Sequence, residues 1–117
     1  MSPPPATGDL AEVPAGTDLL VLRRGRQLAP GTRFVLDASV TSLGRHPDCD
    51  IVLSDVTVSR WHATIRREHG YATLVDGGSL NGTYLNGHPV DEADLGDGDD
   101  VWIGTYRFTF HAGNATP

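Results

Sequence analysis

The central part of the chain alternates between short apolar runs and turn residues, a pattern typical of β-strands. In the segment His62–Arg66, Ala63 and Ile65 are predicted on one face of a strand and the three polar residues on the other. A further strand is predicted over Tyr71–Val75, after a turn at His69-Gly70. These segments predict strands joined by tight turns.

Other parts of the chain repeat this pattern. The pair Asn86-Gly87, flanked by apolar residues, is the strongest signal for a two-residue hairpin. No window has a sustained helical period. Further strands are predicted over Leu19–Leu22, Thr32–Leu36, Val40–Leu43, Ile51–Leu53, Val101–Ile103 and Tyr106–Phe110. About ten or eleven short strands separated by turns predict an all-β sandwich of two sheets, with functional loops at one end.

The two ends of the chain lack this pattern. Residues 1–17 hold four of the eight prolines and few apolar side chains. We therefore expect a flexible N-terminal tail over 1–17, a folded domain over 18–112 and a short C-terminal tail over 113–117.

Composition narrows the function classes. The chain has 117 residues, room for one domain, and a net charge of −6 from 15 acidic and nine basic residues, all of them arginine. This balance disfavours nucleic-acid and anionic-membrane binding. No signal peptide and no apolar run of about 18 residues is seen, and the single cysteine forms no internal disulfide. A cytoplasmic monomer is the expectation.

Metal and cofactor sites are not indicated. The segment Asp91–Asp100 holds six carboxylates, but it lacks the ligand offsets and the glycine of a calcium loop, and we expect a solvated turn. The five histidines and one cysteine lack zinc-ligand spacing.

Catalytic residues are not indicated either. Cys49 has His46 nearby but no third partner, and a small buried hydrophobe is the better interpretation. Ser59 and His62, with Asp76 as an orienting carboxylate, lack the Gly-x-Ser-x-Gly context of a nucleophile. We expect no enzyme, no catalytic residue and no cofactor.

Three segments together carry a more specific signal. They are Leu43-Gly44-Arg45-His46-Pro47, Val58-Ser59-Arg60-Trp61-His62 and the run GSLNGTYLNG over 78–87. With these three segments in this order, the chain resembles the forkhead-associated (FHA) domain, and the resemblance covers about Leu19–His111. It resembles in particular the small actinobacterial FHA regulators of the glycogen-accumulation-regulator type. The resemblance implies an eleven-stranded sandwich that binds phosphothreonine peptides through loops at one end.

The resemblance also implies which residues bind. Arg45 is the principal phosphate ligand, because its planar guanidinium binds phosphate bidentately and stays charged. Ser59 adds a hydroxyl donor and Arg60 a second cation. Ser79 and Leu80 belong to the loop whose side chains and amides add further donors. Asn81 suits the main chain of the peptide. A small pocket for the threonine γ-methyl group would reject phosphoserine.

Four residues are expected to support this site: Gly44, His62, Gly82 and Asn86. The two glycines are expected at turn positions with positive φ, as is Gly87. His62 resembles the family histidine that braces the loops from behind, and Asn86 is expected to cap its own hairpin. Trp61 either packs or anchors a partner. His46 and His88 are expected as solvated loop residues.

The implied partners are phosphothreonine-containing proteins, namely Ser/Thr kinases or their substrates. The alternative is phosphate-independent binding, through the same loops, of a metabolic enzyme of the 2-oxoglutarate dehydrogenase or glutamate dehydrogenase type. In regulators of this type a phosphorylated paired-threonine motif near the N-terminus folds back onto the domain. That motif is missing here. Thr7 is a candidate phosphosite, but a disordered leader is the favoured interpretation.

Overall fold

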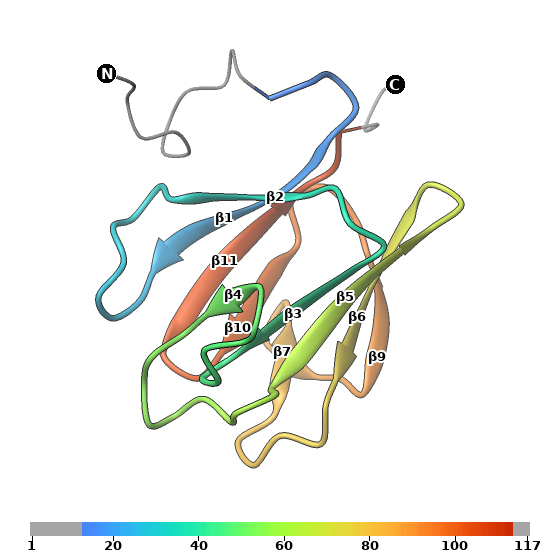
Figure 1. Cartoon of the computed structure of the whole chain (residues 1–117). Helices are drawn as coiled ribbons and strands as arrows, with labels where there is room; N and C mark the ends of the chain where they lie inside the picture. Colours follow the sequence, from blue (N-terminus) through green and yellow to red (C-terminus); the bar gives the residue numbers. More distant parts are fainter. Residues whose placement is uncertain (1–12, 114–117) are drawn as a thin grey trace, which may run out of the picture.

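Two β-sheets make up the fold (Figure 1), which a computed structural model describes for residues 13–113. The strands are β1 (Asp18–Arg24), β2 (Arg33–Leu36), β3 (Val40–Gly44), β4 (Ile51–Val52), β5 (Ala63–Glu68), β6 (Tyr71–Asp76), β7 (Thr83–Leu85), β8 (His88–Pro89), β9 (Glu92–Leu95), β10 (Asp100–Ile103) and β11 (Tyr106–His111). One sheet has the order β2-β1-β11-β10-β7-β8 and the other β4-β3-β5-β6-β9. The predicted all-β sandwich is confirmed. Thr7 and the outer parts of both predicted tails lie outside the described residues.

Alternating side chains from both sheets build the core. Ile65 of β5 and Leu74 of β6 have no exposed surface, whereas the polar residues between core positions are more accessible. The six-stranded sheet adds large aromatic side chains, among them Tyr106 and Phe108 of β11. Full burial of an apolar side chain of this size stabilises the fold by roughly 1.5–3 kcal/mol. The apolar positions therefore determine which face of each strand points inward.

Two tight hairpins have the backbone that their residues predict. Asn86 and Gly87 have φ values of 52° and 85°, and they join β7 to β8 with Leu85 opposite His88. His69 and Gly70 have φ values of 55° and 81° between β5 and β6. Positive φ at both central residues twists a two-residue turn in the same sense as its strands.

The acidic segment differs from its prediction. Within Asp91–Asp100, residues Glu92–Leu95 form β9, which pairs antiparallel with β6 at the edge of the five-stranded sheet. Ala93 and Leu95 are half-buried, whereas the carboxylates between them are exposed. The expectation of a solvated turn is wrong for these residues, because an edge strand accommodates charged side chains on its open face.

Three loops gather at one end of the sandwich, and the coloured trace begins and ends at the opposite end (Figure 1). These loops connect β3 to β4, β4 to β5 and β6 to β7. At the far end the backbone N–H of Gly113 donates to Asp18 Oδ1 over 2.9 Å, which ties the last described residue to the first strand. The loop end is thus free of both described ends of the chain.

Candidate functional site

Ser59 is the point at which the three loops meet. Its carbonyl oxygen accepts the Arg45 N–H over 3.0 Å, and its hydroxyl oxygen accepts the Leu80 N–H over 3.0 Å. Its own N–H donates to Nδ1 of His62, also over 3.0 Å. Because the hydroxyl oxygen acts as an acceptor here, its proton remains available to a ligand.

The side chain of Arg45 is tethered at one atom and open at the others. Its Nε–H donates to the Val58 carbonyl oxygen over 3.0 Å, and the residue is exposed. Among residues 13–113, neither Arg45 nor Arg60 belongs to an ion pair. Tethering at Nε orients the guanidinium and leaves its two terminal amino groups for a doubly accepting anion.

Gly44 serves close packing, and the expected positive φ is absent there. Positive φ occurs at Gly82 and Gly87, with values of 88° and 85°, as expected, but Gly44 is not among these residues. A Cβ atom on Gly44 would lie 2.1 Å from the carbonyl oxygen of Arg60. That oxygen accepts the His46 N–H over 3.1 Å. The missing side chain therefore lets the end of β3 lie against the segment that holds Ser59 and Arg60.

His62 braces the loops from behind, as the resemblance implied. The side chain has no exposed surface, its Nδ1 accepts from the Ser59 N–H, and its Nε2 lies 2.8 Å from the Gly82 carbonyl oxygen. Because a carbonyl only accepts, Nε2 is the donor to Gly82, and Nδ1 is the acceptor from Ser59. The alternation of β5 does not extend to this residue, since His62 and Ala63 are both buried and the strand begins at Ala63.

Asp76 organises the β6–β7 loop, a role that the sequence reasoning missed. Its carboxylate accepts from the Gly78 N–H (2.9 Å), the Ser79 N–H (3.1 Å), the Ser79 hydroxyl (2.5 Å) and the Thr83 hydroxyl (2.6 Å). Burial raises the pKa of Asp76, but the hydrogen bonds from Ser79, Thr83 and Gly78 outweigh it and hold the pKa below its usual range. An Asp followed by Gly-Gly-Ser is the sequence signal that could have indicated this turn.

The expectation that Ser79 donates to phosphate needs correction. Its hydroxyl gives its single proton to Asp76 and accepts the Gly82 N–H over 3.0 Å. Both of these contacts lie inside the loop, so the hydroxyl shapes the loop and has no further proton to donate.

Asn81 and Leu80 lie at the tip of the same loop. One Nδ2–H of Asn81 donates to the Thr57 carbonyl oxygen over 3.0 Å, which leaves the second N–H and Oδ1 for another main chain. The Leu80 side chain is 89% exposed. The loop thus presents an amide and an apolar side chain next to the segment of Ser59.

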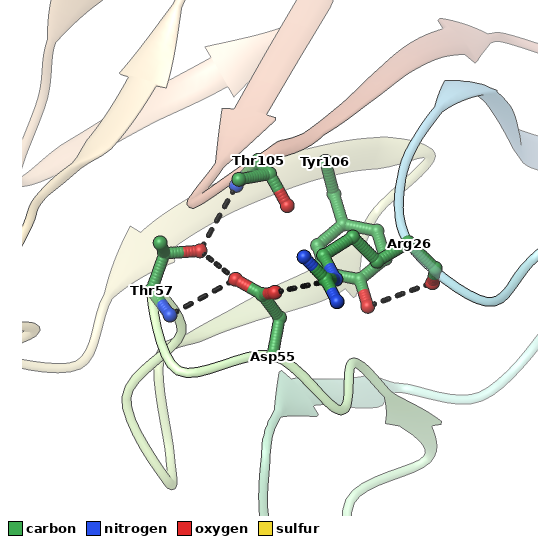
Figure 2. A network of polar contacts seen from close by, with 5 residues as sticks. All are labelled: Arg26, Asp55, Thr57, Thr105 and Tyr106. Atoms are coloured by element: carbon green, nitrogen blue, oxygen red, sulfur yellow. Dashed lines mark hydrogen bonds and ion pairs between the residues drawn. The ribbon is translucent and has the colours of Figure 1, made fainter.

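A polar network behind Thr57 fastens the β4–β5 loop to the six-stranded sheet (Figure 2). The Thr57 hydroxyl donates to Asp55 and accepts the Thr105 N–H over 3.1 Å. Asp55 also pairs with Arg26 Nε over 3.2 Å, and the Tyr106 hydroxyl donates to the Arg26 carbonyl oxygen over 3.0 Å. The two hydrogen bonds from Thr57 are the main reason that the pKa of Asp55 is lowered. Sequence reasoning missed this network, because its members come from three distant segments.

The contacts also show the surroundings of the histidines and the cysteine that the sequence analysis considered. His46 stacks on Trp61 with ring centroids 4.7 Å apart, so the expectation of a solvated His46 is wrong, and Trp61 is 49% exposed. Cys49 is buried, as expected, and burial raises the pKa of its thiol. Both ring nitrogens of His62 bond to the backbone, so a Ser59–His62–Asp76 relay is not assembled.

Asn86 is the one predicted site residue that the structure places away from the loops. Its amide donates to Asp99 Oδ1 over 3.0 Å and accepts the Asp100 N–H over 2.8 Å. It therefore ties the β7–β8 hairpin to the start of β10. Residues 13–113 hold no cluster of three metal-binding side chains. That range also has no helix long and apolar enough to cross a membrane.

Comparison with known proteins identifies a matching family model and similar proteins from actinobacteria. The FHA-domain family model matches residues 41–104. The glycogen accumulation regulator GarA of Mycobacterium tuberculosis is 52% identical over 108 residues, which cover 92% of this chain and 65% of that relative. The oxoglutarate dehydrogenase inhibitor of Corynebacterium efficiens is 50% identical over 114 residues, which cover 97% of this chain and 78% of the relative. This chain thus spans just under two thirds of the length of GarA.

Solved structures agree with this grouping. One FHA domain, from a study of phosphothreonine-dependent FHA interactions, superposes with a TM-score of 0.73 at 34% identity and covers 81% of this chain and 95% of its own. Mycobacterium tuberculosis EmbR in complex with a low-affinity phosphopeptide superposes with a TM-score of 0.77 at 31% identity, over 87% of this chain and 26% of EmbR. With the sandwich, the loop cluster and these relatives in agreement, the chain belongs to the FHA-domain family.

Proposed function

We propose that this protein is a non-catalytic module that binds phosphothreonine peptides and acts in Ser/Thr kinase signalling. One observation carries the proposal. An exposed guanidinium without a carboxylate partner in the described chain, Arg45, shares a loop cluster with the free hydroxyl proton of Ser59 and the open amide of Asn81. These three groups suit a phosphate and the peptide main chain beside it.

The charges favour a phosphorylated ligand. A phosphothreonine carries close to two negative charges and three strong acceptor oxygens. Arg45 binds two of these oxygens, Ser59 donates to a third, and the exposed Arg60 adds a positive charge. Each charge-assisted hydrogen bond contributes roughly 1.5–3 kcal/mol net. After the entropic cost of ordering the peptide and the loops is subtracted, these bonds are consistent with a micromolar dissociation constant, which corresponds to a binding free energy of about −8 kcal/mol.

A calorimetric titration with a phosphothreonine peptide, its phosphoserine analogue and its unphosphorylated counterpart tests this proposal. We expect the strongest binding for phosphothreonine, and we expect Arg45→Ala to cost about 2–5 kcal/mol of affinity. Arg66→Ala is the matched control, because Arg66 is an exposed arginine of β5 that pairs with Glu92 over 3.4 Å. Undiminished binding by Arg45→Ala would show that the site is assigned incorrectly.

A second candidate is phosphate-independent binding of a metabolic enzyme through the same loops. Several relatives are named oxoglutarate dehydrogenase inhibitor, and glutamate dehydrogenase is a second enzyme of this class to test. Apolar side chains are exposed around the loops: Val56 is 92%, Leu80 89% and Trp61 49% accessible. Exposed apolar side chains can be buried in an interface with a protein partner that carries no phosphate group. If this function holds, Trp61→Ala and Leu80→Ala will weaken capture of the purified enzyme, and Arg45→Ala will leave it intact.

We also propose that residues 18–112 suffice for binding and that the chain acts as a monomer. A version trimmed to these residues is expected to bind the phosphopeptide with unchanged affinity and to elute as a monomer in size-exclusion chromatography.

A further inference from the structure

The outer face of the six-stranded sheet carries a basic and aromatic groove. Its residues are Arg23 and Arg24 of β1, Trp102 of β10 and Arg107 of β11, which we call the arginine–tryptophan groove. Together with Asp100 and Phe108 they line an open hollow of about 280 Å³. None of the three arginines takes part in an ion pair within residues 13–113.

Two of the three arginine side chains are held by contacts with neighbouring side chains. The guanidinium carbon of Arg107 lies 3.8 Å from the centroid of the Trp102 ring. Arg24 is its partner across the β1–β11 pair, and Arg23 Nη1 donates to the Thr109 hydroxyl over 3.1 Å. A guanidinium that lies over an indole face can still donate its N–H groups to a carboxylate.

The groove continues to the loop cluster. A second hollow of about 260 Å³ is lined by Asn81 and Thr57 of the loop cluster and by Trp102 and Thr105 of the six-stranded sheet and its β10–β11 turn. A third hollow shares Thr105 with the second and Arg24 and Arg107 with the first. The three hollows therefore adjoin one another on this side of the molecule, from Asn81 to Arg24.

The charge of the groove is opposite to that of the molecule as a whole. The chain has a net charge of −6, yet the groove combines three arginines with one carboxylate, Asp100. That carboxylate accepts from the Thr109 hydroxyl over 3.4 Å. Positive charge gathered on one face of an acidic domain favours an acidic partner and disfavours a basic one.

We propose that the arginine–tryptophan groove binds an Asp/Glu-rich stretch that flanks the phosphothreonine in the same partner. This inference rests on the proposed function, because the hollow that adjoins the groove is lined by Asn81, and one partner chain could therefore place its phosphothreonine at the loops and its acidic stretch in the groove. The groove then selects among phosphothreonine sequences by the charge of residues well away from the phosphate.

Titration of the full chain with a set of phosphothreonine peptides tests the proposal. One peptide is short and neutral, and the others add a run of glutamates or of glutamines, before or after the phosphothreonine, through a glycine-serine spacer. We expect glutamates on one side to strengthen binding on the order of tenfold, and glutamines to have no effect. We expect the gain to disappear in Arg107→Gln and in Arg23→Gln/Arg24→Gln, and to shrink in high salt. Thermal unfolding checks that each variant is folded.

The variant Arg66→Gln separates a local site from a general charge effect. It also removes one positive charge, but from the five-stranded sheet, and it should keep the full gain. Equal losses in Arg66→Gln and Arg107→Gln, or no gain from glutamates while the short phosphopeptide still binds, would overturn the inference and leave the proposed function intact. Failure of the short phosphopeptide itself would instead refute the proposed function.

Discussion

At the scale of single residues, the loop cluster depends on side chains that never reach the surface. His62 joins the Ser59 N–H to the Gly82 carbonyl oxygen, and it is completely buried. We expect His62→Ala to lower the free energy of unfolding by about 2–4 kcal/mol, because it leaves a cavity and two unpaired backbone groups. Urea denaturation measures this loss. His88→Ala, at an exposed position of β8, should stay within about 0.5 kcal/mol of the wild type, and an equally small effect of His62→Ala would contradict its role.

Gly44 gives a second prediction at this scale. A methyl group there would meet the Arg60 carbonyl oxygen at 2.1 Å, so we expect Gly44→Ala to cost about 1–3 kcal/mol and to weaken phosphopeptide binding by displacing the Ser59 segment. At Gly96 a Cβ would have its nearest neighbour at 3.7 Å and φ is not positive, so Gly96→Ala is the control. Chemical denaturation measures the free energy of unfolding of the two variants. Equal values for Gly44→Ala and Gly96→Ala would contradict the close-packing role of Gly44.

At the scale of elements, carboxylates hold the loops in shape. The pKa of Asp76 is lowered in the folded protein, because hydrogen bonds to its carboxylate outweigh its burial. A lowered folded pKa stabilises the protein fully above the unfolded value, about 3.9, and this contribution is lost as the pH falls through the folded pKa. We expect Asp76→Asn to be clearly less stable than wild type at neutral pH, and the difference to shrink below about pH 4.

Urea denaturation at neutral and acid pH measures that difference. Asp94→Asn is the control, because Asp94 is exposed on β9 and accepts one side-chain hydrogen bond, from Thr73 over 3.1 Å. A difference between Asp76→Asn and wild type that stays constant from neutral to acid pH would contradict the contribution of the ionised carboxylate.

Elements with strong local signals were predictable from sequence. Alternation located β5 and β6, and Asn86-Gly87 located the β7–β8 hairpin. The strand β9 was not predictable in this way. Its two half-buried residues, Ala93 and Leu95, stand in a run of carboxylates that is typical of an exposed turn. Within the candidate site, motif resemblance indicated Arg45 and Ser59. The hydrogen bonds that Asp55 and Asp76 accept depend on how loops pack in three dimensions, and no periodicity encodes such packing.

At the scale of the whole molecule, net charge is a poor guide to ligands. Within the described chain, Arg26, Arg66 and Arg67 are paired with carboxylates. Of the arginines without an ion pair there, Arg45 and Arg60 lie at the loop end and three others in the arginine–tryptophan groove, whereas exposed carboxylates gather along β9 and the turn that follows it. We therefore expect acidic ligands to bind only where free guanidinium groups gather, at the loop end and in the arginine–tryptophan groove.

The central claim is that phosphate is recognised at this loop end. Amide chemical shifts of the full chain, followed by NMR during titration with a short neutral phosphothreonine peptide, test it most directly. The account predicts that perturbed amides cluster at residues 44–46, 58–61 and 79–82, and that the unphosphorylated peptide leaves them unchanged. Perturbations centred on the edge strand β9, or identical shifts with both peptides, would contradict it.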